Sequence, residues 1–426
     1  MGLNLWSLVG ARDFSPASKK KLAVVALLYF VQGAPAAILW EVLPVYFRLH
    51  GVSLRAIGGL RLLELPYSLK VFWSPLVHRY GDRRAWITAC MLGIAAVVVA
   101  LPSVDVGAVG WVVLGLILAL TTLSATQDVA IDSYSVGLIN REEEGAANGI
   151  RASAYRVALV FVGGGMVFLA AALQWNVLFL LSGVFFALLA LIASFIPRLS
   201  LPAEARRGWL AGFVGWAGTW RIVPLVLFVL TYRLGEFALG PMVKPFWVDY
   251  GQSIWPVQED LMFQIGLFPT SFGIALSVLG ALLGGAFISR FGIFHGVWFL
   301  GALQAVSNLG YALVAWLNLG GFGLYGASMF ESLSGGLGTA SFLAFLMNVC
   351  DKEHATVQYA FLSSIFSLTG RLVGSMSGLG AEAYGYGNYF ALTFLMSTPA
   401  YLLLPWVKTW IKERPKPPDR RSRAAG

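Results

Sequence analysis

The segment Ser124-Ala-Thr-Gln-Asp-Val-Ala-Ile-Asp-Ser-Tyr134 carries two carboxylates inside a long apolar stretch. On a helix, their four-residue spacing places Asp128 and Asp132 on one face, about one turn apart. Each acid at bilayer depth costs roughly 2.5–3.5 kcal/mol, so we expect the pair to face other helices or a water-filled path. This pattern is typical of a proton or ion relay within a bundle of membrane helices.

The composition of the whole chain indicates a membrane protein. Of the 426 residues, 58% are hydrophobic and only 12% are charged, whereas about a quarter of the residues of a soluble domain are charged. The chain is therefore predicted to be an all-α, multi-pass membrane protein. Twelve apolar stretches are long enough to cross a hydrocarbon core of ~30 Å. They are Leu22–Phe47, Ala56–Val77, Ala85–Leu101, Gly110–Tyr134, Ala147–Leu173, Val177–Ile196, Ile222–Val248, Ile265–Ile288, His295–Leu317, Gly321–Val349, Val357–Glu382 and Tyr389–Val407.

Basic residues predict the orientation of these spans. With an even number of spans both termini share one side, which then holds nearly all loop arginines and lysines, while the opposite loops hold only Arg48 and Arg55. The positive-inside rule places both termini in the cytoplasm. The net charge of +9 follows from this asymmetry and from a basic tail that can contact anionic lipid. No nucleic-acid partner is expected, and Met1–Pro16 lacks the pattern of a signal peptide.

The chain divides into two halves of six spans each. A polar segment separates them, so we predict a first bundle over residues 1–196, a cytoplasmic linker over 197–221, a second bundle over 222–407 and a basic cytoplasmic tail over 408–426. The halves are weakly similar, since Leu123-Ser124-Ala125 in the fourth span matches Leu333-Ser334-Gly335 in the tenth. Duplicated six-span halves are typical of transporters in which two bundles move around a central site.

Catalytic and metal-binding chemistry is not expected. Cys90 and Cys350 lie in or beside apolar spans, and the four histidines are scattered without ligand spacing, so we predict no metal, no cofactor and no catalytic residue. A membrane-embedded transferase is a weaker alternative, because it needs a nucleophile or base with its partners.

The loop after the second span, Ser74-Pro-Leu-Val-His-Arg-Tyr-Gly-Asp-Arg-Arg84, resembles the loop between helices two and three of the major facilitator superfamily. That resemblance implies a gating loop formed by His78, Arg79, Gly81, Arg83 and Arg84. His78 stands where the family usually has an aspartate, which implies a weaker or pH-sensitive latch. The alternative is a short cytoplasmic turn whose arginines only set the topology.

Several other tracts resemble the muropeptide permease (AmpG) group of this superfamily, which more distantly includes acetyl-coenzyme A transporters. The resemblance covers nearly the whole chain and implies twelve helices in two pseudo-symmetric six-helix halves. The tracts are Leu28-Tyr-Phe-Val-Gln-Gly33, Pro66-Tyr-Ser-Leu-Lys70, Thr126-Gln-Asp-Val-Ala-Ile-Asp132, Asn148 with Arg151, Tyr155-Arg156, Tyr232-Arg-Leu-Gly235 and Phe330-Glu-Ser-Leu-Ser-Gly-Gly-Leu-Gly-Thr339.

What the resemblance implies is proton-driven import of anhydromuropeptides, the sugar-peptide fragments recycled from the cell wall, across the inner membrane. The expected partners are a small amphiphilic or anionic substrate, protons and membrane lipid, with the protein acting as a monomer. Two alternatives stay open: transport of another anionic amphiphile such as acetyl-coenzyme A, and export instead of import.

The intramembrane polar residues are the candidates for the site. Asp128 and Asp132 are predicted to couple protons, because two acids one turn apart disfavour each other's charge and titrate as a pair. Arg151, Arg156 and Arg233 are predicted to hold anionic groups, since guanidinium forks match carboxylates and phosphates. The other residues predicted to contact the cargo are Tyr29, Gln32, Lys70, Gln127, Tyr155, Glu236 and Glu331. The alternative is that roughly half of these charges form interhelical pairs and that most of the tyrosines pack in the core.

Overall fold

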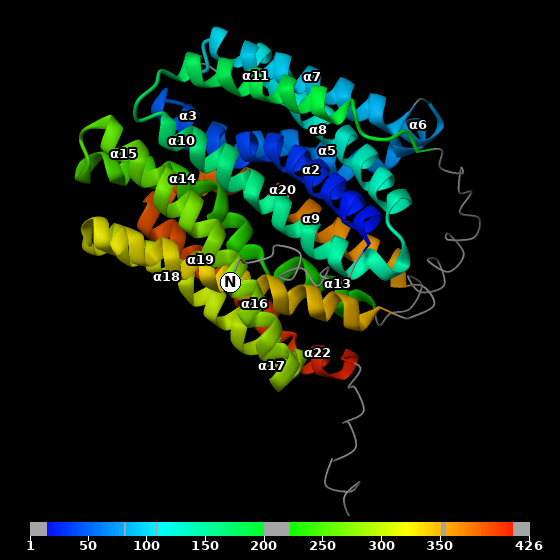
Figure 1. The fold of residues 1–426 in the computed structure, drawn as a ribbon. Helices are drawn as coiled ribbons and strands as arrows, with labels where there is room; N and C mark the ends of the chain where they lie inside the picture. Colours follow the sequence, from blue (N-terminus) through cyan, green and yellow to red (C-terminus); the bar gives the residue numbers. More distant parts are fainter. Residues whose placement is uncertain (1–14, 81, 108, 200–221, 351–354, 412–426) are drawn as a thin grey trace, which may run out of the picture.

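The computed structural model describes residues 15–80, 82–107, 109–199, 222–350 and 355–411. Within these ranges the chain is helical and contains no β-strand (Figure 1). Most of the predicted linker and of the predicted tail lies outside the described residues. In Figure 1 α7, α8 and α11 lie at the top and α13, α16 to α19 and α22 at the bottom, while α14, α15 and α20 lie at the height of α9 and α10.

The first half contains six successive helical segments. They are α2 (Pro16–Ala37), η1 (Ile38–Val42) and α3 (Leu43–Leu49); α4 (Leu54–Gly59), η2 (Leu60–Glu64), α5 (Leu65–Leu69), η3 (Lys70–Phe72) and α6 (Ser74–Arg79); α7 (Arg83–Ala100) and η4 (Leu101–Ser103); α8 (Trp111–Leu138), followed by η5 (Arg141–Glu143); α9 (Glu144–Ala158), η6 (Leu159–Gly164) and α10 (Gly165–Leu169); and α11 (Trp175–Ala193).

The second half is built in the same way. Its elements are α13 (Ile222–Thr231) and α14 (Leu234–Ile254); α15 (Gln258–Ile265), η7 (Gly266–Phe272) and α16 (Gly273–Phe291); α17 (Ile293–His295), η8 (Gly296–Leu300) and α18 (Gly301–Leu317); α19 (Gly320–Val349); and α20 (Ala355–Ser397), α21 (Pro399–Leu402) and α22 (Leu404–Trp410).

Nine helices in the described residues are long and apolar enough to cross a membrane, and they coincide with nine of the predicted spans. Two further predicted spans share α20. Its backbone leaves the helical region at Gly385, where φ is +72°, a conformation that favours glycine. Residues 370 and 374 pack against residues 237 and 241 of α14, whereas residues 386 and 393 contact residues 249 and 235. The chain therefore reverses direction at Gly385, and α20 holds two antiparallel segments.

The predicted span Ala56–Val77 is wrong as a single helix. The chain from Leu54 to Arg79 is a series of short α- and 3₁₀-segments, and Pro66 and Pro75 stand at the start of two of them. Proline lacks an N–H donor and interrupts the hydrogen bonds of the preceding turn. The series nevertheless runs beside α8, where the Thr121 hydroxyl donates to the Leu63 carbonyl oxygen at 2.7 Å.

The two halves meet at the end of the bundle that carries Arg48, here called the Arg48 end. The Arg48 Nε atom lies 2.6 Å from an Asp249 carboxylate oxygen, and Lys244 pairs with Glu41 at 2.7 Å. One core of buried side chains contains residues of both halves. Toward the opposite end, here called the basic end because Lys21, Arg84, Arg290 and Lys408 lie there, the second half has a separate core around Phe228 and Phe345.

Close contact between α4 and α20 helps to join the halves at the Arg48 end. A Cβ atom added at Gly378 would overlap the Leu54 carbonyl oxygen and would lie 2.7 Å from the Arg55 Cα atom. The two backbones are also close at Gly58, where an added Cβ atom would lie 2.7 Å from the Gly378 nitrogen. Small residues at these positions let the two helix backbones touch.

Gly378→Val is expected to open the Arg48 end. An overpacked contact costs about 1–3 kcal/mol, so a cysteine placed at Ile57, which is 5% exposed, should react roughly tenfold faster with an impermeant maleimide. The experiment uses a chain in which Cys90 and Cys350, both buried, are replaced by serine. Gly59→Val is the matched control, because a Cβ atom there meets no atom within 4 Å. Equal labelling in the two variants would contradict this role of Gly378.

Glu143 ties α2 to the loop before α9 at the basic end. Its carboxylate accepts the backbone N–H of Asn140 at 2.9 Å and lies 3.5 Å from Lys21 Nζ. These donors, with Asn140 first, lower the pKa of Glu143. A lowered pKa in the folded protein means that the stabilisation is present at neutral pH and is lost as the pH falls.

Glu143→Gln is therefore expected to destabilise the protein at neutral pH by about 1 kcal/mol. The difference from wild type should shrink as the pH falls through the ordinary glutamate range near ~4.3. Thermal unfolding in detergent at several pH values checks this. Glu142→Gln, at an exposed neighbouring position, is the control, and a difference independent of pH would contradict the assignment.

Candidate functional site

The two carboxylates of α8 lie on one helix face, and each has its own partner. Asp128 forms a close ion pair with Lys70 of η3. Asp132 accepts a hydrogen bond of 2.7 Å from the Tyr29 hydroxyl of α2. The side chain of Lys70 is 30% exposed, while that of Asp128 is only 13% exposed. The predicted acidic pair is thus held by residues of the first and second helical segments.

Two predicted arginines lie on α9, and the contacts of Arg151 place it beside the acidic pair, since Tyr29 connects it to Asp132. Arg151 donates to the Asn148 amide oxygen at 3.1 Å and stands 5.4 Å from the centre of the Tyr29 ring. Its Nε atom is buried without a hydrogen-bond partner. In the described ranges, neither Arg151 nor Arg156 makes an ion pair. An arginine guanidinium that has no ion-pair partner can bind an anionic group of a ligand.

The packing of α2 against α9 brings further predicted residues to this wall of the first half. A Cβ atom added at Gly33 would lie 2.7 Å from the Tyr155 carbonyl oxygen, so the glycine lets the two helices approach closely. Tyr155 is half-buried. The Oε1 atom of Gln32, one residue before Gly33, is buried without a partner. Tyr29 thus contacts the acidic pair directly, and Gln32 and Tyr155 lie at the packed contact of α2 with α9.

A second charged cluster lies in the other half. Arg233, which precedes α14, forms a close two-point ion pair with Glu236. Glu331 of α19 comes near the same place, because one carboxylate oxygen of Glu331 and one of Glu236 each lie 3.9 Å from a Cβ position built on Gly335. A pocket of about 210 Å³ borders Arg233 and Glu236. The alternative of interhelical pairing thus describes Lys70, whose acidic partner lies on α8, whereas Arg233 pairs with an acid three residues along its own segment.

Gln127 is not brought to the site. Its side chain is fully buried, and its amide nitrogen contacts the Met91 sulfur of α7 at 3.3 Å. Adjacent residues on a helix point about 100° apart, so Gln127 faces the core when Asp128 faces Lys70. We therefore leave Gln127 out of the site that we propose below.

The described part of the predicted gating loop makes its contacts within the first half. Asp82 caps α7 and lies 3.6 Å from Arg84 and 3.5 Å from Arg198. Arg83 is 9% exposed, and Arg79 stands over the ring of its neighbour Tyr80. Gly81 and the side chain of His78 lie outside the described residues.

Arg371 was not assigned to the site from the sequence, although it is a cation inside an apolar span. It lies on α20 and donates to the Ser68 hydroxyl at 2.6 Å and to the Ser367 hydroxyl. Its guanidinium stands 5.9 Å from the centre of the Tyr67 ring, and its Nε atom is buried without a partner. Arg371 is thus, like Arg151 and Arg156, an arginine of a predicted span that makes no ion pair in the described residues, and it contacts the opposite half.

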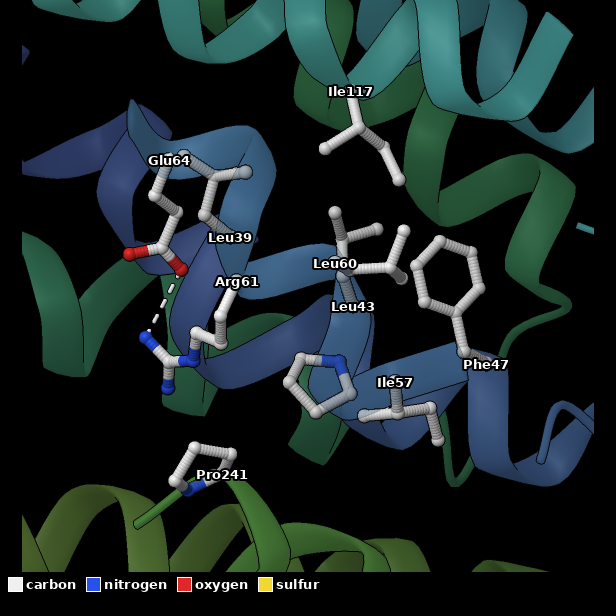
Figure 2. A pocket seen from close by; sticks show the side chains of 10 residues that line it. Leu39, Leu43, Phe47, Ile57, Leu60, Arg61, Glu64, Ile117 and Pro241 are labelled. Atoms are coloured by element: carbon white, nitrogen blue, oxygen red, sulfur yellow. Dashed lines mark hydrogen bonds and ion pairs between the residues drawn. The ribbon is translucent and has the colours of Figure 1, made fainter. Parts of the chain in front are cut away.

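The best-defined pocket lies between the halves and contains none of the predicted site residues. Figure 2 shows its apolar walls, the ion pair of Arg61 with Glu64 at 3.0 Å, and Pro241 approaching from α14. The empty space at this pocket, including its opening to solvent, is about 430 Å³. The described ranges place no group of three or more His, Cys, Asp or Glu side chains where they could hold a metal ion.

Comparison with known proteins assigns the family. The chain matches the Major Facilitator Superfamily over residues 22–375. This chain belongs to the major facilitator superfamily. The match confirms the predicted fold class, and the protein is accordingly a multi-pass membrane transporter.

Relatives of this facilitator include proteins named for one kind of cargo. It is 27% identical to the anhydromuropeptide permease of Escherichia coli strain K12 over 401 residues, which cover 90% of this chain and 78% of the relative. It is 25% identical to the putative transporter AmpG 4 of Rickettsia conorii over 415 residues, 91% of this chain and 97% of the relative. These matches confirm the resemblance to the muropeptide permease group.

Solved structures of other facilitators share the fold. A bacterial homologue of the human lysosomal transporter Spinster superposes with a TM-score of 0.72 at 15% identity, covering 95% of this chain and 99% of that one. The nucleoside transporter NupG superposes with a TM-score of 0.70 at 15% identity, covering 94% and 100%. At these identities the likeness concerns the facilitator fold alone.

Proposed function

We propose that this transporter imports anhydromuropeptides across the inner membrane and that protons drive the import. One observation carries the proposal: Tyr29 contacts both Arg151, which makes no ion pair among the described residues, and Asp132, which lies one turn from the ion pair of Asp128 with Lys70. A proton site and an anion site are then neighbours. The relative named anhydromuropeptide permease, 27% identical, supports the choice of cargo.

The neighbouring positions suggest how proton and cargo binding are coupled. When a proton neutralises Asp128, the attraction to Lys70 is lost and the lysine becomes a cation without a partner. Lys70 is partly exposed and can then bind an acidic group of the cargo. Loss of the proton restores the ion pair and releases that group. Tyr29 adds a second connection, because it contacts both Asp132 and Arg151.

The free arginines fit a cargo with several acidic groups. Arg151 and Arg156 belong to the first half, whereas Arg371 belongs to the second half and already contacts Ser68 across the boundary. A peptide with two or more carboxylates could bind all three and so connect the halves. Tyr155 and Gln32 supply an aromatic ring and an amide for the sugar part. Arg233 and Glu236 would contact the cargo as a neutral pair.

The proposal includes an orientation and an oligomeric state. Both termini and residues 197–221 are placed in the cytoplasm, because the basic end carries most of the loop arginines and lysines. The Arg48 end then faces the periplasm, and the ion pairs of Arg48 and Lys244 hold the halves together on that side. The transporter is proposed to act as a monomer with halves 1–196 and 222–407.

A cargo with phosphate groups, such as acetyl-coenzyme A, is the second candidate. The arginines that favour a carboxylate cargo favour phosphate equally. Export instead of import would use the same site in the reverse order.

Uptake by proteoliposomes tests the proposal. We expect labelled anhydromuropeptide to accumulate when a proton gradient is directed inward and not when a protonophore is added. Excess unlabelled anhydromuropeptide should compete, and acetyl-coenzyme A should not. Competition by acetyl-coenzyme A alone would favour the second candidate, while accumulation that survives the protonophore would contradict proton coupling.

A further inference from the structure

Glu331 is an acid in the interior of α19 without a cation of its own. In the described ranges it makes no ion pair, and the one hydrogen bond to its carboxylate there is a long contact of 3.4 Å from the neighbouring Ser332 hydroxyl. Eleven residues precede it in α19, which runs over Gly320–Val349, so it lies well inside the membrane-crossing segment. Asp128 and Glu64, in contrast, each pair with a basic side chain.

The cations nearest to Glu331 are already occupied. Arg233 is held by Glu236 through two close contacts. Lys244 lies 2.7 Å from Glu41 and 2.5 Å from the Thr270 hydroxyl. Glu236 and Glu41 therefore neutralise most of the positive charge of Arg233 and Lys244, and little net positive charge remains near Glu331.

The other groups near Glu331 do not supply a positive charge. Glu236 is a second acid, and its carboxylate approaches the same Gly335 position at 3.9 Å. Tyr311 of α18 interacts with Glu331 electrostatically and is fully buried. The one basic residue of α16, Arg290, lies in its last turn at the basic end, and Arg371 of α20 binds Ser68 and Ser367 instead.

An isolated carboxylate inside a membrane protein is unfavourable when it is charged. The neutral acid avoids the desolvation penalty and also the repulsion from Glu236. We propose that Glu331 carries a proton in this conformation and is a second proton-coupling residue, located in the half opposite to Asp128. The reaction is simple: the carboxylate takes up one proton from water on one side of the membrane and releases it to water on the other.

This inference deepens the proposed function and rests on it for the transport step. With one proton on the coupled pair of Asp128 and Asp132 in the first half and one on Glu331 in the second, each cargo molecule would cross with two protons. One acid in each half would then be neutralised when the protons and the cargo bind. The transporter would therefore change conformation without the cost of enclosing charged carboxylates in the membrane.

Infrared spectroscopy of the purified transporter tests the bound proton without any cargo. A neutral carboxylic acid has a carbonyl absorption separate from that of a carboxylate. We expect this band at neutral pH in wild type, its loss in Glu331→Gln, and its retention in Glu259→Gln, a control at an exposed position. An unchanged spectrum in Glu331→Gln would overturn the proposal. So would a Glu331→Gln variant that fails to fold, because glutamine closely resembles the neutral acid.

Accumulation at equilibrium tests the proton count. With the membrane potential clamped at zero and a gradient of one pH unit, two protons support about 100-fold accumulation and one proton about tenfold, since each contributes about 1.4 kcal/mol. We expect Glu331→Gln to lower the ratio from about 100 to about 10. A ratio of about 10 in both proteins would overturn the second site. Absence of gradient-driven uptake in wild type would instead contradict the proposed function, and the infrared result would still decide whether Glu331 is protonated.

Discussion

Asp128→Asn is expected to abolish net proton-driven uptake while leaving cargo binding intact. Asparagine resembles the protonated acid, so Lys70 stays free to bind the cargo. The empty carrier must then return with an unpaired lysine in place of the ion pair. Removal of one partner from a buried pair costs about 3–5 kcal/mol, which slows the return by roughly 100-fold or more.

Two assays separate these steps. The initial rate of gradient-driven uptake should fall by at least about 100-fold, in proportion to the slower return. Exchange of labelled for unlabelled cargo across the membrane should continue, because exchange uses only the loaded carrier. Asp105→Asn, at an exposed loop position, is the matched control. An uptake rate in Asp128→Asn equal to that of wild type would show that another residue binds the proton. Loss of both uptake and exchange would indicate that Asp128 has a structural role.

Arg151→Gln is expected to weaken cargo binding by roughly 10- to 100-fold, because a hydrogen bond to a charged group is worth about 1.5–3 kcal/mol. Arg156→Gln should have a similar effect. The half-saturating concentration should rise with little change in maximal rate, since neither arginine has a proton-accepting acid as its partner. Arg151→Lys should recover only part of the affinity, because lysine keeps the charge but lacks the planar fork.

Comparison of natural cargo with amidated cargo tests whether Arg151 binds a carboxylate. A cargo analogue whose peptide carboxylates are amidated should bind wild type and Arg151→Gln about equally, if that arginine holds a carboxylate. A double-mutant cycle between arginine and carboxylate then measures the coupling directly. Arg290→Gln, at an exposed position in the last turn of α16, controls for a general change in charge. Equal loss of affinity for the natural and amidated cargo would exclude direct pairing.

The sequence predicts which residues of the site share a helix face, but not which residues from other helices contact them. The four-residue spacing of Asp128 and Asp132 correctly predicted a shared helix face, because helix periodicity is local. The partners Lys70 and Tyr29 are 58 and 103 residues away in the chain. Only the packing of η3 and α2 against α8 brings them to those acids. Gln127 was misassigned for the same reason, since its surroundings depend on which face of α8 meets α7.

The sequence also does not show which arginines have an acidic partner, as Arg233 and Arg371 illustrate. Both are arginines inside apolar spans, and the sequence analysis assigned Arg233 to anion binding and left Arg371 unassigned. In the structure Arg233 has Glu236 as its partner, whereas among the described residues Arg371 contacts hydroxyl and carbonyl acceptors and the Tyr67 ring. A single sequence cannot separate a paired arginine from a free one, because pairing depends on distances between side chains on different helices.

The sequence by itself determined the class of this protein. Long apolar stretches are unfavourable in water and in a membrane must satisfy their backbone hydrogen bonds within helices, and the motif tracts by themselves indicate the superfamily. Tertiary structure alone decided that the second span is a series of short helices, that α20 reverses at Gly385, and that Glu331 makes no ion pair among the residues that the structure describes. Hydropathy and periodicity act over one helix at a time, whereas the pairing of charges and the meeting of the two halves depend on residues brought together from distant parts of the chain.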